Sequence, residues 1–185
     1  MKKSVVFAAF VSLLIMATMA SAQKAPADFS GKWNLDLSKS KLSDREKQSI
    51  ESETITVTQT AADFKIETET KRVAPPDGGG GGGGGARGAG GGRGMGGPQT
   101  YPLGKETTSD MQMGQNTVPV TMGSKWEGSK LVVSRSSTFN GPNGEVKNVR
   151  KQTFELGADG KSLTVTTEST GMQGTTTSTR VYSKG

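Results

Sequence analysis

The chain has 185 residues, a formal net charge of +6, and neither cysteine nor histidine. This length suits one domain, and without disulfides that domain must be held by a packed core. The missing residue types exclude zinc-type metal sites and catalysis that depends on histidine or cysteine. No other catalytic constellation is present, so we expect a protein that is not an enzyme and has no cofactor and no metal. The charge surplus is mild, and we expect no nucleic-acid partner.

The first 22 residues have the pattern of a secretory signal peptide. Lys2 and Lys3 precede an apolar run over Val5–Met19, and Ala20-Ser21-Ala22 forms a small-residue cleavage site. We therefore expect residues 1–22 to be removed after Ala22 and residues 23–185 to be exported, either periplasmic or secreted, with no membrane segment left. Removing the two lysines lowers the formal charge from +6 to +4. The alternative is a retained N-terminal helix.

The first expected strand covers Phe29–Leu37. Apolar or small side chains occupy its odd positions and polar ones its even positions. Because side chains alternate faces along a strand, this pattern predicts one buried face and one wet face. Trp33 is the largest side chain on the face expected to be buried.

The next segments predict a connection and then a hairpin. In 38–52, Ser43 followed by Glu46 matches a capping box, so this segment is either a short helix or a solvated loop. Strands are expected over Glu53–Gln59 and Phe64–Thr70, because both alternate. The four residues between them form the turn of the hairpin.

A glycine tract then interrupts the domain, and we expect residues 75–99 to form a disordered loop. Such a segment loses much chain entropy on ordering and has almost no apolar side chains to bury. Its Arg87-Gly88 and Arg93-Gly94 pairs resemble Arg-Gly nucleic-acid tails. Two arginines are too few for that role, so a flexible loop is the better interpretation.

The rest of the chain predicts a meander of strands joined by glycine turns. The expected strands are 100–103, 118–126, 130–139, 146–156, 162–169 and 175–182. Threonine and valine are enriched in them, and no long helix is indicated. The prediction is an all-β protein, an antiparallel up-and-down β-barrel of about eight to ten strands. A two-layer sandwich is the alternative.

Three motifs resemble the calycins, the group of the lipocalins and fatty-acid-binding proteins. The sequence Phe29-x-Gly31-x-Trp33-x-Leu35 resembles their opening strand. Residues 125–135 look like a late strand pair of the fatty-acid-binding proteins, and residues 179–182 look like their closing strand. The chain is also similar to small lipocalin-like exported proteins of bacteria. The resemblance implies a lipocalin-like barrel that holds a ligand.

In fatty-acid-binding proteins two arginines and a tyrosine hold the ligand carboxylate, and the matching positions here are Arg135, Arg180 and Tyr182. A guanidinium can bind a carboxylate through two hydrogen bonds, and a phenol adds a third donor. Arg135 shares its strand parity with Leu131 and Val133, so it faces inward if they do. The facing of the last strand is open. In the other interpretation Arg180 stacks on the first-strand tryptophan, as in lipocalins.

Trp33 and Trp126 are also candidate ligand-binding residues, with plain core as the alternative. The function expected from all this is an exported lipocalin-like protein that binds a small hydrophobic molecule inside the barrel, with a fatty acid as one candidate. The alternative is a non-enzymatic structural or interaction module of the cell envelope, whose barrel is packed solid. Ligand identity and oligomeric state stay open.

Overall fold

The computed structural model describes residues 26–74, 97–113, 116–141 and 144–185. The expected signal peptide, residues 1–22, lies outside the described residues, as does most of the glycine-rich insertion expected over 75–99. In the part of the chain that is described, no helix is long and apolar enough to cross a membrane.

Ten strands and one short helix make up the described chain. Their bounds are β1 Gly31–Lys41, α1 Asp44–Ser49, β2 Ile50–Gln59, β3 Asp63–Arg72, β4 Gln99–Pro102, β5 Glu106–Met113, β6 Asn116–Glu127, β7 Lys130–Gly141, β8 Gly144–Leu156, β9 Ser162–Gly171 and β10 Gly174–Lys184. All paired strands are antiparallel. The all-β prediction is confirmed, and the expected hairpin between residues 53 and 70 is β2–β3.

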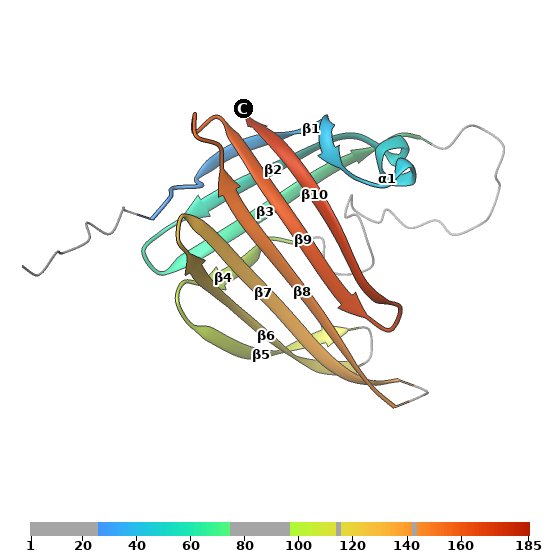
Figure 1. Cartoon of the computed structure of the whole chain (residues 1–185). Coiled ribbons are helices and arrows are strands. Elements are labelled where there is room, and N and C mark those ends of the chain that lie inside the picture. Colours follow the sequence, from blue (N-terminus) through green and yellow to red (C-terminus); the bar gives the residue numbers. More distant parts are fainter. Residues whose placement is uncertain (1–25, 75–96, 114–115, 142–143) are drawn as a thin grey trace, which may run out of the picture.

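The strands form one sheet that curls into a nearly closed barrel (Figure 1). Their order is β4-β3-β2-β1-β10-β9-β8-β7-β6-β5, so the opening and terminal strands are neighbours. Near the seam, the Ser124 hydroxyl on β6 donates a hydrogen bond of 2.8 Å to the carbonyl oxygen of Pro102, the last residue of β4. The backbone N–H of Gly104 donates to the same hydroxyl. These bonds connect β4, one edge strand, and the residues just after it to β6, which lies next to the other edge strand, β5.

β1 has the two-faced pattern that its sequence predicts. Phe29, just before it, and Trp33 are fully buried, while Lys32 and Asn34 are exposed. Beyond Asp36 the pairing with β10 shifts register, and the strand runs to Lys41, further than expected. An irregularity of this kind bends a strand, and here the bend leads the chain into α1.

Of the two interpretations of residues 38–52, the short helix is confirmed, and its capping box is formed. The backbone N–H of Glu46 donates to the Ser43 hydroxyl, and the backbone N–H of Ser43 donates to Glu46 Oε2. Both bonds satisfy donors that the first turn of a helix leaves unpaired. None of the six residues of α1 is buried, so packing contributes little to holding this helix.

Aromatic side chains fill one half of the barrel. The Phe29 ring stacks on Trp126 and meets Phe64 and Phe154 edge to face, with ring centroids about 6 Å apart in each pair. The buried residues of this core are Phe29, Trp33, Ile55, Val57, Phe64, Ile66, Tyr101, Leu131, Val133, Phe154, Leu163, Val165 and Tyr182. They come from nearly every strand, so the core fixes how the sheet curls.

The sequence did not predict β5. Its residues, Glu106–Met113, are polar at six of eight positions, and only Met111 and Met113 are apolar, so most of the segment lacks the apolar alternation that marks a strand. Pairing with β6, from Glu106 opposite Gly123 onward, defines it. The expected insertion also ends slightly earlier than predicted, since Gln99 already belongs to β4.

Candidate functional site

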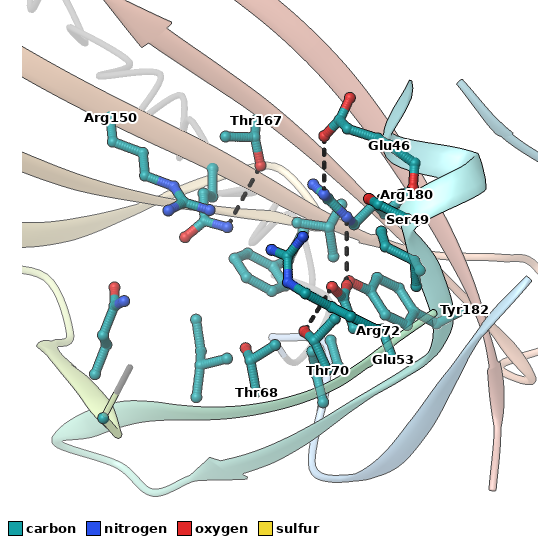
Figure 2. A pocket seen from close by; sticks show the side chains of 18 residues that line it. Glu46, Ser49, Glu53, Thr68, Thr70, Arg72, Arg150, Thr167, Arg180 and Tyr182 are labelled. Atoms are coloured by element: carbon teal, nitrogen blue, oxygen red, sulfur yellow. Dashed lines mark hydrogen bonds and ion pairs between the residues drawn. The ribbon is translucent and has the colours of Figure 1, made fainter. Parts of the chain in front are cut away.

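A cavity of about 170 Å³ lies in the half of the barrel nearest α1. Figure 2 shows that charged and hydroxyl side chains from the strands and from the helix point into it. The polar lining is Glu46, Ser49, Glu53, Thr68, Thr70, Arg72, Gln99, Arg150, Gln152, Thr167, Arg180 and Tyr182. Apolar side chains complete it, namely Ile50, Ile55, Ile66, Phe154 and Val165. The barrel is therefore solid at one end and hollow at the other.

Glu53 is the centre of the polar network in this cavity. It lies on β2 with only 8% of its surface exposed, on the same face as Ile55. The Tyr182 hydroxyl donates a hydrogen bond of 2.7 Å to Glu53 Oε1, and the Thr70 hydroxyl donates one of 3.1 Å to Oε2. A buried carboxylate needs such donors, because burial removes the water that would otherwise solvate its charge.

Arg180 on β10 lies between two carboxylates (Figure 2). Its Nη2 is 3.2 Å from Glu46 Oε1, and its Nε is 3.3 Å from Glu53 Oε1. The second contact is close enough for charge attraction, but the Nε–H makes no hydrogen bond there, and this buried donor has no acceptor among the described residues. The guanidinium therefore keeps an unused donor inside the barrel.

Two further arginines, Arg72 on β3 and Arg150 on β8, line the same cavity. Neither makes a hydrogen bond or ion pair with another described residue, and both are exposed enough to meet solvent. The cavity thus holds three guanidinium groups against two carboxylates. This surplus of positive charge makes it attractive to an anion.

The network shifts the acidity of two of its members. Burial, and then the charge and hydrogen bond of Glu53, raise the pKa of Tyr182 well above its ordinary 10.0, so this phenol stays neutral and donates. Burial by itself would raise the pKa of Glu46. The hydrogen bonds from Ser43 and the charge of Arg180 outweigh it, and the pKa lies below 4.5. Glu46 is therefore charged at neutral pH.

The structure brings together two of the three residues expected to hold a carboxylate. Tyr182 is 3% exposed and Arg180 lines the cavity, which settles the facing of the last strand. Arg135 shares the inner face with Leu131 and Val133, as its parity predicted, and is paired across the strands with Arg150. It does not line the cavity, and its Nη2 contacts the sulfur of Met111 at 3.3 Å.

The two tryptophans lie in the solid half and do not line the cavity. Trp33 is fully buried, with its Nε1–H donating to the carbonyl oxygen of Phe29 at 2.9 Å. The alternative interpretation, in which Arg180 stacks on this ring, is wrong. Lys184 takes that place, 5.4 Å from the ring centroid, because it lies directly opposite Trp33 in the β1–β10 register.

Sequence reasoning missed Glu46, Glu53, Arg72 and Arg150 as site residues. Three of them carry a usable signal. Glu53 shares its parity with Ile55, Arg150 with Phe154, and Arg72 with Ile66. A charged residue in phase with the apolar face of a strand is a candidate interior group. Glu46 carries no such signal, since it lies on a helix that only the barrel places.

The fold and the cavity define a class. This is an up-and-down antiparallel barrel of the lipocalin-like kind, as the sequence resemblance implied, with first and last strands paired and a polar cavity beside a short helix. No protein-family model matches the sequence, and a search of curated proteins finds no match.

Among solved structures the chain is similar to three small barrel proteins. One is a secretary abundant heat soluble protein from Ramazzottius varieornatus, with 12% identity, a TM-score of 0.48, and coverage of 85% of this chain and 95% of that one. The second is a zebrafish ileal bile acid-binding protein complexed with cholic acid, with 18% identity, a TM-score of 0.44, and coverage of 85% and 98%. The third is a Schistosoma mansoni fatty acid binding protein in complex with arachidonic acid, with 18% identity, a TM-score of 0.40, and coverage of 85% and 96%.

Proposed function

We propose that this protein binds a small amphipathic anion, an apolar molecule with one carboxylate, in the cavity next to α1. The observation that carries the proposal is the lining itself. Apolar side chains and an excess of guanidinium groups line the same cavity.

The apolar part of the lining would receive the body of the ligand. Ile55, Ile66, Phe154 and Val165 belong to the hydrophobic core and also border the cavity. Burying apolar ligand surface against them contributes about 25 cal/mol per Å². Nothing polar on these side chains would lose a hydrogen bond in the process.

The guanidinium groups would receive the carboxylate. Arginine matches a carboxylate in shape and can donate two parallel hydrogen bonds to it. Arg150 has no ion-pair partner among the described residues, and the buried Nε–H of Arg180 has no acceptor there. An incoming anion would supply acceptors to donors that the chain leaves without them.

The size of the cavity favours a short ligand. Pockets for drug-sized molecules measure about 300–1,000 Å³. This cavity, at about 170 Å³, is smaller. The presence of this cavity argues against the alternative of a structural module whose barrel is packed solid throughout. A six-carbon fatty acid such as hexanoate is therefore the first probe, with oleate as the long-chain comparison.

Isothermal titration calorimetry of the purified mature chain tests the proposal with hexanoate and with hexanol. We expect saturable hexanoate binding and weaker hexanol binding. Arg150→Ala removes a charged hydrogen bond worth about 1.5–3 kcal/mol, so it should weaken hexanoate by roughly 10- to 150-fold and leave hexanol almost unchanged.

Arg135→Ala is the matched control, because Arg135 is the cross-strand neighbour of Arg150 on the same inner face and lies outside the cavity lining. It should change hexanoate affinity much less. The proposal fails if no probe, oleate included, binds saturably, or if the two variants weaken hexanoate equally.

We also propose, from the N-terminal sequence, that the protein is exported after cleavage following Ala22. Expression of the full chain in a bacterial host, followed by fractionation and N-terminal sequencing, tests this. A periplasmic or secreted product beginning at Gln23 would support it. An uncleaved product in the cytoplasm would refute it.

A further inference from the structure

We propose that Glu46 is a built-in competitor for the anion site. Its carboxylate holds Nη2 of Arg180, so a ligand carboxylate that accepts from Nη2 as well as from the unused Nε–H must displace it and thereby detach α1 from β10. This inference rests on the proposed function and adds a regulation of the same site.

The contact joins two elements that are otherwise loosely connected. Glu46 lies on α1 and Arg180 lies on β10, 134 residues further along the chain. No residue of α1 is buried, so the helix gains little from packing. The Arg180 side chain is 19% exposed and that of Glu46 is 42% exposed. The arginine is thus fixed in the barrel wall, and the glutamate is the partner free to leave.

The same ion pair stands between two hollows. Inside it is the cavity described above. Outside it is a groove whose lining is wholly polar, formed by Lys41, Ser43, Glu46, Arg150, Ser169, Thr176, Thr177, Ser178 and Arg180. Glu46, Arg150 and Arg180 border both spaces. Separating Glu46 from Arg180 would therefore change the lining of the cavity and of the groove alike.

The two carboxylate oxygens of Glu46 have separate partners. Oε1 contacts Arg180, while Oε2 accepts from the backbone N–H and the hydroxyl of Ser43 in the capping box. A ligand carboxylate that reaches Arg180 would replace the contact between Glu46 Oε1 and the guanidinium with an equivalent contact of its own. The capping bonds of Oε2 do not depend on that contact, so α1 can stay folded while it moves away.

Competition of this kind lowers the apparent affinity for anions without affecting neutral molecules. When an internal group occupies a site, the apparent affinity for a ligand falls to the intrinsic affinity multiplied by the fraction of time that the site is free. A partly exposed ion pair is worth up to about 1 kcal/mol, which corresponds to a factor of about five in affinity. Glu46 therefore tunes which ligands are retained.

Glu46→Gln is the informative variant. Glutamine also serves in a capping box, so the helix start is kept while the charge at Arg180 is removed. We expect calorimetry to show hexanoate binding about two- to fivefold tighter than wild type, with hexanol unchanged.

Asp44→Asn is the matched control, since it removes the same charge from the same helix, and no hydrogen bond or ion pair links Asp44 to Arg180. It should raise hexanoate affinity less than Glu46→Gln does. Equal gains in the two variants, or unchanged or weaker binding by Glu46→Gln, would overturn the competition. Binding of neither probe to any variant would instead overturn the proposed function.

Hydrogen exchange gives a second readout. In wild type, saturating hexanoate should speed exchange of the α1 amides, because the tie to Arg180 is broken. In the Glu46→Gln variant, hexanoate should change the exchange rate of the α1 amides little. Protection of α1 by hexanoate in wild type would show that the helix closes on the ligand, contrary to the proposal.

Discussion

Replacing Glu53 with alanine should cost about 3–5 kcal/mol of folding stability, the range seen when one partner of a buried charged pair is removed. Glu53 is 8% exposed and receives hydrogen bonds from Tyr182 and Thr70. Without it, both hydroxyls lose their acceptor and Arg180 loses its inner carboxylate. Each hydrogen bond to the charge is worth about 1.5–3 kcal/mol, and the losses overlap because one group makes all of them.

Two further substitutions divide this cost. Glu53→Gln keeps an oxygen acceptor for Tyr182 but removes the charge near Arg180. We therefore expect it to cost about half as much folding stability as Glu53→Ala. Thr70→Val removes a single hydrogen bond at nearly constant volume and should cost about 1.5–3 kcal/mol. The series therefore separates charge from hydrogen bonding.

Urea unfolding followed by far-ultraviolet circular dichroism measures these values, with free energies from linear extrapolation. Glu51→Ala is the matched control on the same strand, because its ion pair with Lys71 is exposed. It should cost less than about 1 kcal/mol. A cost for Glu53→Ala as small as that for Glu51→Ala would mean that Glu53 is solvated, and the account of the site would be wrong.

Further predictions concern the core and the pH dependence. Trp33→Ala should cost about 3–5 kcal/mol of folding stability, because it truncates a buried aromatic side chain. Lys184→Ala should cost less than about 1 kcal/mol, as expected for a solvent-exposed cation that lies over an aromatic ring. Equal costs in urea unfolding would contradict the buried position of Trp33. Because the pKa of Tyr182 is raised by burial and by Glu53, its contribution to stability is fully present below pH 10.0 and is lost as pH rises through the folded value. Alkaline unfolding should show this loss in wild type, and Tyr182→Phe should abolish it. Since the pKa of Glu46 lies below 4.5, its contribution is present above that value and fades in acid; Glu46→Gln should flatten this acid slope, and an unchanged slope would contradict it.

The interior positions of the strands could largely be predicted from parity. Phe29 and Trp33 are buried as the alternation of β1 required, and Arg135 follows Leu131 and Val133 to the inner face. The last strand could not be oriented this way. Its residues from Thr175 to Thr179 are all hydroxylic, so the alternation that would distinguish its two faces is missing.

Register, by contrast, decided which partner each inner side chain meets. One of the two interpretations of Arg180 put it over Trp33, but the strand offset puts Lys184 opposite that ring and Arg180 near Glu53. The offset between β1 and β10 depends on how the whole sheet curls. No local pattern in either strand contains that information.

The sequence by itself determined the two-faced strands, the turns between them and the capped start of α1, because these depend on neighbours a few residues apart. Only the tertiary structure decided that the aromatic side chains would fill one half of the barrel. It also decided that Glu46, Glu53 and Arg180 would meet in the other half. The physical reason is that such contacts join residues from 35 positions apart (Phe29 and Phe64) to 134 positions apart (Glu46 and Arg180), and only the curling of the sheet brings them together.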